Sequence, residues 1–190
     1  NFGNVGATDQ FGDPDHDGMN NLQEFNNVTN PNVYDGPNAP VAQGPVCGSE
    51  IATQQTSLVA RNAVDPQGQA LLYQFELYRD PAMTILVIAQ DNVPQGAGQT
   101  TAYQVPVSLL ENTHYYWRVR AKDPFTYGPY SAPACGFFVN TANEAPNAPR
   151  INSPVFAGQA NSLTPTLKVD NATDPDEDVL TYTYEVYRDQ

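Results

Sequence analysis

Basic residues are scarce in this sequence. Its 190 residues include 8 Lys and Arg against 21 Asp and Glu, which gives a formal net charge of -13 at pH 7. Nucleic acids and anionic membranes both bind proteins through a basic footprint. The charge therefore argues against either of them as a partner.

Long apolar runs and catalytic residue patterns are also missing. No run of about eighteen apolar residues occurs, so the sequence predicts no membrane insertion. The N-terminus lacks the charged-then-apolar pattern of an export signal. Neither histidine, His16 or His114, accompanies a Ser or Cys nucleophile in a recognisable context. We therefore expect no enzymatic activity.

The most informative stretch is the acidic segment from residue 13 to residue 24. A twelve-residue calcium loop supplies oxygen ligands at positions 1, 3, 5, 7, 9 and 12 and has glycine at position 6. Gly18 stands at the glycine position. The ligand positions are occupied by Asp13, Asp15, Asp17, Met19 through its backbone carbonyl, Asn21 and Glu24. The pattern predicts a Ca²⁺ site, and the alternative is a solvated acidic turn.

The residues around this loop do not predict a complete EF-hand. Residues 1–12 are rich in Gly and Asn and lack the apolar spacing of an entering helix. After the loop, Leu22 and Phe25 favour a short helical turn that ends before Asn30-Pro31, because proline disfavours helix at the preceding residue. We expect a small EF-hand-like loop with one short helix.

The N-terminal segment resembles a known family of calcium repeats. Asn1-Phe2-Gly3, the aspartate-rich loop and Thr29-Asn30-Pro31 are similar to the thrombospondin type 3-like repeats of secreted bacterial proteins. In that family another aspartate-rich loop usually precedes the Asn-Phe-Gly, and this sequence lacks it. The resemblance implies a calcium-binding segment over residues 1–36.

The next hundred residues or so, 37–141, alternate short apolar runs with turns, which is typical of a β-sandwich of about seven strands. The period of two in one strand points Leu71, Tyr73, Phe75 and Leu77 inward. Further strands are expected at 57–64, 84–89, 101–105, 114–122 and 136–140. The fold class is therefore predicted to be mainly β.

Residues 109–121 resemble the sixth strand of a fibronectin type III domain. The resemblance makes Tyr115 the tyrosine-corner residue, with Leu109 packed beneath it. The alternation then places Trp117 and Val119 in the core. Ala60 stands where the family often has a core Trp, and we expect Trp117 to fill that space. The alternative is that Trp117 is a sugar-stacking platform.

The two cysteines are expected to pair. Cys47 lies near the predicted start of the first strand and Cys135 opens the last one. Such ends can lie side by side in an extracellular sandwich, which favours a Cys47–Cys135 disulfide. The alternatives are two free thiols or a metal-binding pair, and no third Cys or nearby His supports a metal.

A predicted loop near the end of the sandwich gathers aromatic residues. Phe125, Tyr127 and Tyr130 form a candidate ligand loop, since binding loops cluster at the ends of such sandwiches. The alternative is that these aromatic side chains pack on their own scaffold, with Tyr130 against the sheet.

An internal repeat indicates a second module. Pro37-Asn-Ala-Pro40 recurs as Pro146-Asn-Ala-Pro149, and at the same offset Leu71 aligns with Leu180 and Tyr73 with Tyr182. We therefore expect residues 146–190 to form the N-terminal part of a second sandwich. Its inner face lacks covering strands, so we expect neighbouring modules of the same or identical chains as partners.

The second module carries its own acidic turn. Asp174, Asp176 and Asp178 occupy the positions of Asp65, Gln67 and Gln69 in the first module. They form a possible second calcium site, although the glycine and distal glutamate of the first loop have no counterpart. The alternative is a solvated turn.

Two classes of function follow from these patterns. The first is a calcium-stabilised spacer, adhesive module or filament subunit of an extracellular or cell-surface protein. The second is a carbohydrate- or substrate-binding accessory region of a secreted hydrolase, contacting surface glycans or proteins through the aromatic loop. Tandem modules and calcium loops account for most of the sequence without a ligand, which favours the first class.

Overall fold

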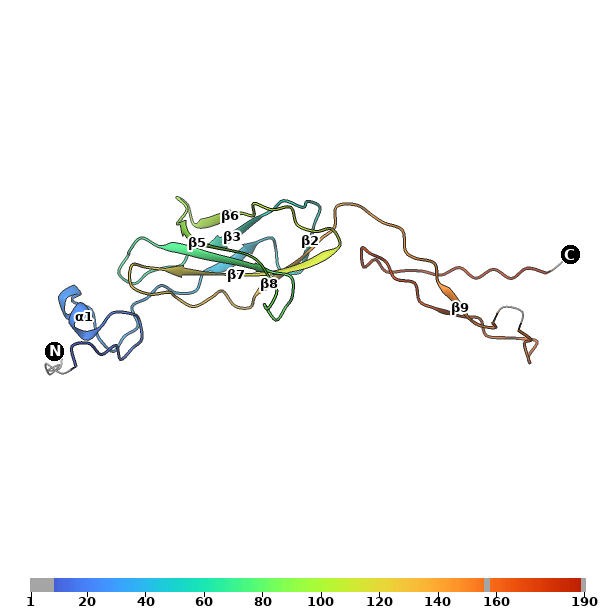
Figure 1. Cartoon of the computed structure of the whole chain (residues 1–190), viewed down its shortest axis with the longest axis horizontal. Coiled ribbons are helices and arrows are strands. Elements are labelled where there is room, and N and C mark those ends of the chain that lie inside the picture. The colour runs from blue at the N-terminus through green and yellow to red at the C-terminus, as the bar shows by residue number, and fades with distance from the viewer. Residues whose placement is uncertain (1–8, 156–157, 189–190) are drawn as a thin grey trace. The chain divides into compact units, whose positions relative to one another are not determined.

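The computed structural model describes residues 9–155 and 158–188 (Figure 1). The Asn1-Phe2-Gly3 motif and Asp189 lie outside the described residues. The chain is divided into two compact units, Asn1–Thr141 and Ala142–Gln190. Within the described ranges, no helix has the length and apolar character needed to cross a membrane.

The described part of the first unit, residues 9–141, contains one helix and two β-sheets. Helix α1 spans Asn21–Asn27, and the Asn20 side chain caps it by accepting a hydrogen bond from the Gln23 backbone N–H. The first sheet has the strand order β1-β3-β6, and the second has the order β2-β8-β7-β4-β5. The strands are β1 (Val41–Gly44), β2 (Ser49–Ile51), β3 (Ser57–Arg61), β4 (Leu72–Tyr78), β5 (Leu86–Pro94), β6 (Thr100–Gln104), β7 (Thr113–Lys122) and β8 (Cys135–Val139).

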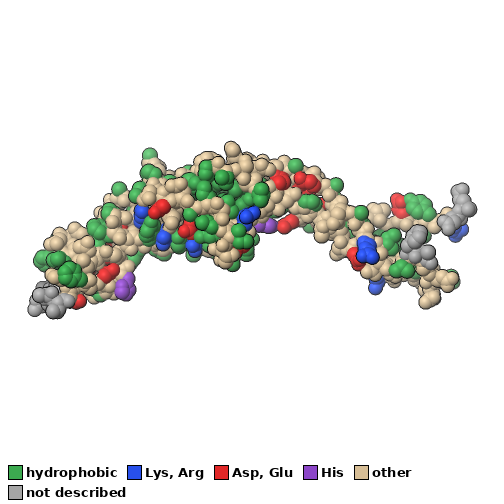
Figure 2. Space-filling view, in the orientation of Figure 1, with side chains coloured by type: hydrophobic (Ala, Val, Ile, Leu, Met, Phe, Trp, Pro, Cys, Tyr) green, Lys and Arg blue, Asp and Glu red, His purple; other side chains and the backbone are tan. Residues whose placement is uncertain are grey.

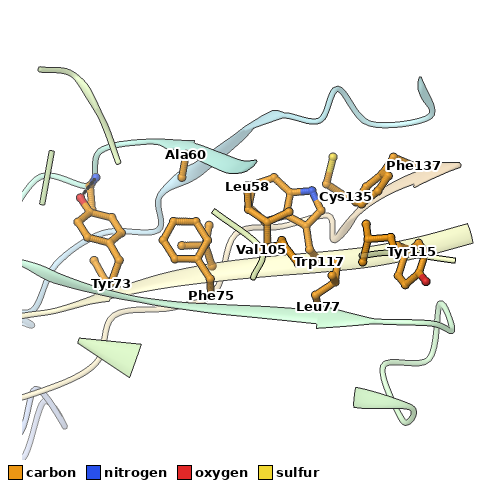
Figure 3. Close-up of a cluster of buried hydrophobic side chains, with 14 of the residues drawn as sticks. Leu58, Ala60, Tyr73, Phe75, Leu77, Val105, Tyr115, Trp117, Cys135 and Phe137 are labelled. Carbon is orange, nitrogen blue, oxygen red and sulfur yellow. Dashed lines mark hydrogen bonds between the residues drawn. The ribbon is translucent and has the colours of Figure 1, made fainter. Parts of the chain in front are cut away.

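The two sheets form a sandwich. All strand pairs in it are antiparallel except β2 and β8, which run parallel. The inner faces enclose one core of buried apolar side chains (Figure 3). The predicted mainly β, fibronectin type III-like fold is confirmed. The strand expected to start near Cys47 is β2, and β1 is an addition to the expected strands.

The predicted alternation of core residues is confirmed on both central strands. Tyr73, Phe75 and Leu77 of β4 are almost completely buried, as are Tyr115 and Trp117 of β7. The Tyr115 hydroxyl accepts a hydrogen bond from the Leu110 backbone N–H at 2.8 Å, which makes the tyrosine corner. These contacts fix the register between the strand and the turn before it.

Trp117 is a core residue. Its side chain is 0% exposed, and its ring stacks on that of Phe75 with centroids 6.2 Å apart. Ala60 is also fully buried on the opposite sheet, where it leaves room for these larger rings. Figure 3 shows the indole and the Phe75 ring between the two sheets. A side chain enclosed in this way cannot stack on a sugar.

Two strand predictions were wrong at their ends because side chains occupy the backbone N–H groups. The strand predicted at 57–64 stops at Arg61, since the Ala63 N–H is bound by the Tyr73 hydroxyl. The strand predicted at 84–89 begins at Leu86, since the Asp80 carboxylate accepts the N–H groups of Thr84 and Ile85. That strand continues to Pro94.

The described residues of the second unit form fewer strands than expected. Strands β9 (Arg150–Ser153) and β10 (Lys168–Asp170) form a two-stranded antiparallel sheet. The segment that aligns with β4, residues 180–188, has no strand structure in its described residues. In the first unit β4 is held between β5 and β7, and no described strand of the second unit pairs with 180–188. Val179, Val186 and Tyr187 are largely exposed there.

The two units nevertheless repeat the same local hydrogen bonds. The Tyr73 hydroxyl accepts the Ala63 N–H at 2.9 Å, and the Tyr182 hydroxyl accepts the Ala172 N–H at the same distance. Likewise, Asn38 and Asn147 accept the N–H groups of their aligned partners, Val64 and Thr173, at 2.8 Å. The sequence repeat is therefore also a structural repeat, between residues 38–73 of the first unit and residues 147–182 of the second.

Candidate metal centre

The N-terminal acidic loop folds back on itself. The carboxylates of Asp13, Asp15 and Asp17 each place an oxygen within 4.8 Å of the other two. Backbone N–H groups hold two of them, since Asp13 accepts from Gly18 at 3.2 Å and Asp17 accepts from Met19 at 2.8 Å. Three acidic groups at these separations repel one another unless a cation lies among them.

Glu24 lies on the buried face of α1. The exposed fraction of its side chain is 0%, and neither carboxylate oxygen has a hydrogen-bond donor among the described residues. Buried polar atoms are nearly always hydrogen-bonded, and a buried carboxylate without a partner is strongly unfavourable. The predicted helical residues Leu22 and Phe25 are instead exposed. Helix α1 therefore buries a carboxylate and exposes apolar side chains.

Electrostatic repulsion in the loop is reflected in the pKa values. Burial and the negative charges of four neighbouring aspartates raise the pKa of Glu24 from 4.5 to about 7. Burial and the charge of Asp17 also raise the pKa of Asp15 and of Asp35. A bound divalent cation would reverse this effect, because it favours the ionised form of each carboxylate.

Asp35 is a candidate ligand that the sequence did not reveal. One of its carboxylate oxygens lies within 4.8 Å of oxygens from Asp17 and Glu24, which makes a second acidic group sharing Asp17. Its backbone N–H also donates to the Asp17 carboxylate at 3.3 Å. Asp35 follows the twelve-residue loop, in the linker, so the loop pattern gives no reason to select it.

The two remaining predicted ligands are buried beside these carboxylates. The Asn21 side-chain amide donates to the Asp9 carbonyl at 2.7 Å, and its oxygen has no donor in the described part of the chain. Met19 is 2% exposed. The described oxygen atoms fit a hard cation such as Ca²⁺, which takes six to eight oxygen ligands. Binding through the Met19 carbonyl stays a prediction.

The acidic loop packs against one end of the sandwich. Gly18 has a φ of +91°, and a Cβ atom there would lie 2.9 Å from the Phe125 carbonyl oxygen. Glycine is therefore required by both the backbone conformation and the close approach. A further contact lies in the linker, where the Tyr34 hydroxyl donates to the Tyr127 carbonyl at 3.5 Å. The Gln67 side chain, in a turn of the sandwich, favours the ionised form of the Asp35 carboxylate.

The predicted ligand loop is occupied by contacts to its own sheet. The guanidinium of Arg120 lies 3.9 Å from the ring centroid of Tyr127, and that of Arg118 lies 4.0 Å from the centroid of Tyr130. The hydroxyls of these tyrosines donate to Asp91 and Glu76 at 2.7 and 2.8 Å. This geometry favours packing over ligand binding for both rings.

Phe125 differs from the two tyrosines. Its side chain is 40% exposed, and its backbone N–H donates to the Asp123 carboxylate at 2.7 Å. Glycan or protein binding through Phe125, Tyr127 and Tyr130 stays a prediction. On the face drawn in Figure 2, basic and acidic side chains are interspersed.

The two cysteines form a disulfide in the structure. Cys47 lies just before β2 and Cys135 begins β8, the strand that pairs with β2, and their Cα atoms are 4.8 Å apart. Neither free thiols nor a metal pair is present at these positions. The disulfide therefore joins the two strand ends that we expected to lie side by side.

The predicted second calcium site lies in the second unit. Asp174, Asp176 and Asp178 each place one carboxylate oxygen within 4.8 Å of the other two. Asp176 is buried and Asp178 is exposed. The structure thus brings together all three predicted residues.

No family model matches the sequence, and no curated protein matches it either. Among solved structures, the chain is similar to the crystal structure of the FN1-FN3 domains of chicken CNTN1, with 15% sequence identity and a TM-score of 0.38. The match covers 60% of this chain and 39% of that one.

Proposed function

We propose that this chain is a calcium-stabilised structural module of an extracellular protein, in which one Ca²⁺ fixes the N-terminal segment to the end of the sandwich. The observation that carries the proposal is Glu24, a fully buried carboxylate whose two oxygens lack donors among the described residues. Calcium supplies the missing positive partner.

The choice of Ca²⁺ follows from the donor set. Asp13, Asp15, Asp17 and Glu24 offer only oxygen atoms, at the spacing of a calcium loop, and Asp35 adds a further carboxylate. Extracellular calcium modules bind with dissociation constants of about 10⁻⁴ to 10⁻³ M. We expect an affinity in that range for this site.

The position of the site supports a mechanical role. The Asp35 side chain belongs to the acidic group, and the Gln67 side chain, in a turn of the sandwich, favours the ionised form of the same carboxylate. A cation that fixes Asp35 therefore also fixes the linker to that turn. Gly18 adds a second contact to this junction, because its backbone lies so close to Phe125 that no side chain fits at position 18.

The wider setting belongs to the same proposal. A disulfide, a calcium loop and a strongly acidic surface suit a secreted protein. The resemblance to thrombospondin type 3-like repeats favours a bacterial surface protein built from tandem modules. In such an array the chain acts as a spacer or adhesive segment, with neighbouring modules as its partners and without catalysis.

Titration calorimetry with Ca²⁺ tests the proposal. Glu24→Ala should abolish binding at the loop, and Asp35→Ala should weaken it, because each removes a carboxylate of the group. Glu50→Ala is the matched control, since it removes an exposed carboxylate from strand β2. Equal calcium binding by the wild type and Glu24→Ala would show that the assignment is wrong.

Hydrogen exchange tests the junction separately. Addition of Ca²⁺ should slow amide exchange in residues 9–36 of the wild type, with a smaller change in Asp35→Ala. A calcium-dependent change confined to residues 13–24 would contradict the role at the junction while leaving the binding site intact.

A further inference from the structure

The turn at Asp174 in the second unit has the same backbone structure as the turn at Asp65 in the first. Asp174 accepts the N–H of Asp176 with its side chain at 2.9 Å, and Asp65 accepts the N–H of Gln67 at the same distance. The residues that follow Gln67 and Asp176 both have a left-handed backbone conformation, with a φ of 71° at Gly68 and 63° at Glu177. One hydrogen-bonded scaffold therefore occurs twice.

The side chains on this scaffold differ in charge. Gln67 and Gln69 of the first unit are replaced by Asp176 and Asp178 in the second. With Asp174 they place three carboxylate oxygens within 4.8 Å of one another. The second turn thus carries two more negative charges at aligned positions, and their mutual repulsion opposes its folding unless a cation balances them.

Asp176 gives independent evidence that a ligand belongs here. Its side chain is only 5% exposed, and one oxygen accepts the Glu144 backbone N–H at 2.7 Å. The other oxygen, Oδ1, is buried and has no donor within the described residues. A buried carboxylate with an unpaired oxygen is strongly unfavourable without a positive partner.

The residue of the first unit that aligns with Asp176 is Gln67. There, Gln67 is a neutral amide that favours the ionised form of the Asp35 carboxylate, and Asp35 occupies the position of Glu144. Asp176 replaces this donor with an acceptor. At these three aligned positions the first turn has one carboxylate, Asp65, whereas the second turn has three.

We propose that Asp174, Asp176 and Asp178 bind a second Ca²⁺ ion. The donor atoms are carboxylate oxygens, and the exposure of Asp178 leaves room for water molecules to complete a calcium coordination shell. Through Asp176 the ion also fixes the backbone at Glu144, at the start of this unit. The site shares no residue with the loop at 13–24, so it does not depend on the function proposed above.

Calcium titration of the full chain tests this site through a double variant. D176Q/D178Q gives the second turn the glutamines of the first turn, which the same scaffold already accommodates. The wild type should bind two Ca²⁺ ions, and the double variant should lose one ion per chain. In the Glu24→Ala background, the remaining calcium binding should disappear when D176Q/D178Q is added.

The matched control is D170N/E185Q, which removes two exposed carboxylates of the second unit outside the turn. It should retain both ions. Amide exchange at Ala172 reports whether the scaffold is intact, because its N–H is bound by Tyr182. Unchanged stoichiometry in D176Q/D178Q, or equal loss in D170N/E185Q, would overturn the second site without affecting the loop site.

Discussion

Residues 37–79 of the first unit and residues 146–188 of the second have similar sequences but end in different structures. Residues 71–79 of the first unit and 180–188 of the second share leucine, tyrosine and glutamate at aligned positions. The first segment contains β4, between β5 and β7, and the second has no described strand structure. Local sequence therefore specifies the turns and their hydrogen bonds, whereas the strand requires its neighbours.

The two units also differ in where their acidic side chains lie. The first unit combines neutral glutamines in its turn with carboxylates in a separate loop that reaches the turn through Asp35. The second unit carries its carboxylates in the turn itself. The backbone scaffold and the candidate ligand set are therefore separable, and each can be changed while the other is kept.

The largest expected effect comes from removing the disulfide, which only the first unit has. Cys47 aligns with Phe156, which lies outside the described residues. The bond closes a loop with a sequence separation of 88. C47S/C135S should lower the free energy of unfolding of the first unit by roughly 4 to 5 kcal/mol, measured by urea denaturation. A decrease below about 1 kcal/mol would contradict this expectation.

The next effect concerns Glu76 and its counterpart Glu185. Burial raises the pKa of Glu76, but hydrogen bonds from Tyr78, Arg118 and Tyr130 outweigh burial and lower it from 4.5. A depressed pKa stabilises the folded state above 4.5, and this contribution disappears as the pH falls through the folded-state pKa. Glu185 is exposed and accepts a hydrogen bond from Tyr187.

Glu76→Gln should therefore reduce the free energy of unfolding by about 1.5 to 3 kcal/mol near neutral pH, and by much less in acid. Urea denaturation at about pH 7 and about pH 2 measures the difference. Glu185→Gln serves as the control and should change the unfolding of the first unit at neither pH. An equal loss for Glu76→Gln at both pH values would show that ionisation of Glu76 contributes nothing.

The smallest effect compares the two repeated tyrosine hydrogen bonds. Tyr73→Phe leaves the buried Ala63 N–H without its acceptor, which should cost about 1 to 3 kcal/mol. Tyr182→Phe should cost less than about 1 kcal/mol, because Tyr182 and Ala172 are only half-buried and water can replace the hydroxyl. Amide exchange at Ala63 and Ala172 measures both. A larger effect at Tyr182 would reverse the expected order.

Much of the first unit could be predicted from the sequence because its signals are local. The alternation around Tyr73 and Trp117 predicted that both side chains are buried. The spacing of the acidic residues from Asp13 to Glu24 predicted that their carboxylates lie close together. Both signals depend on residues close together in the chain. They require no knowledge of tertiary structure.

The rest depended on contacts between distant residues. Asp35 joins the acidic group only because the linker folds back toward α1, and no sequence spacing encodes that approach. The early end of β3 depends on the Tyr73 hydroxyl. The segment 180–188 has the alternation of a strand but no described partner strand. Periodicity predicts which residues suit a strand, and pairing decides whether one forms.

The Cys47–Cys135 disulfide also determines how the first unit would respond to tension. A spacer pulled from both ends unfolds by releasing chain length. The bond encloses 88 positions of sequence, which correspond to roughly 300 Å of fully extended chain. Force cannot release that length while the bond is intact, although the sheets inside it can still separate. Tension would therefore extend the segments outside the bond first, including the junction at Asp35, and the sandwich would behave as a nearly inextensible link.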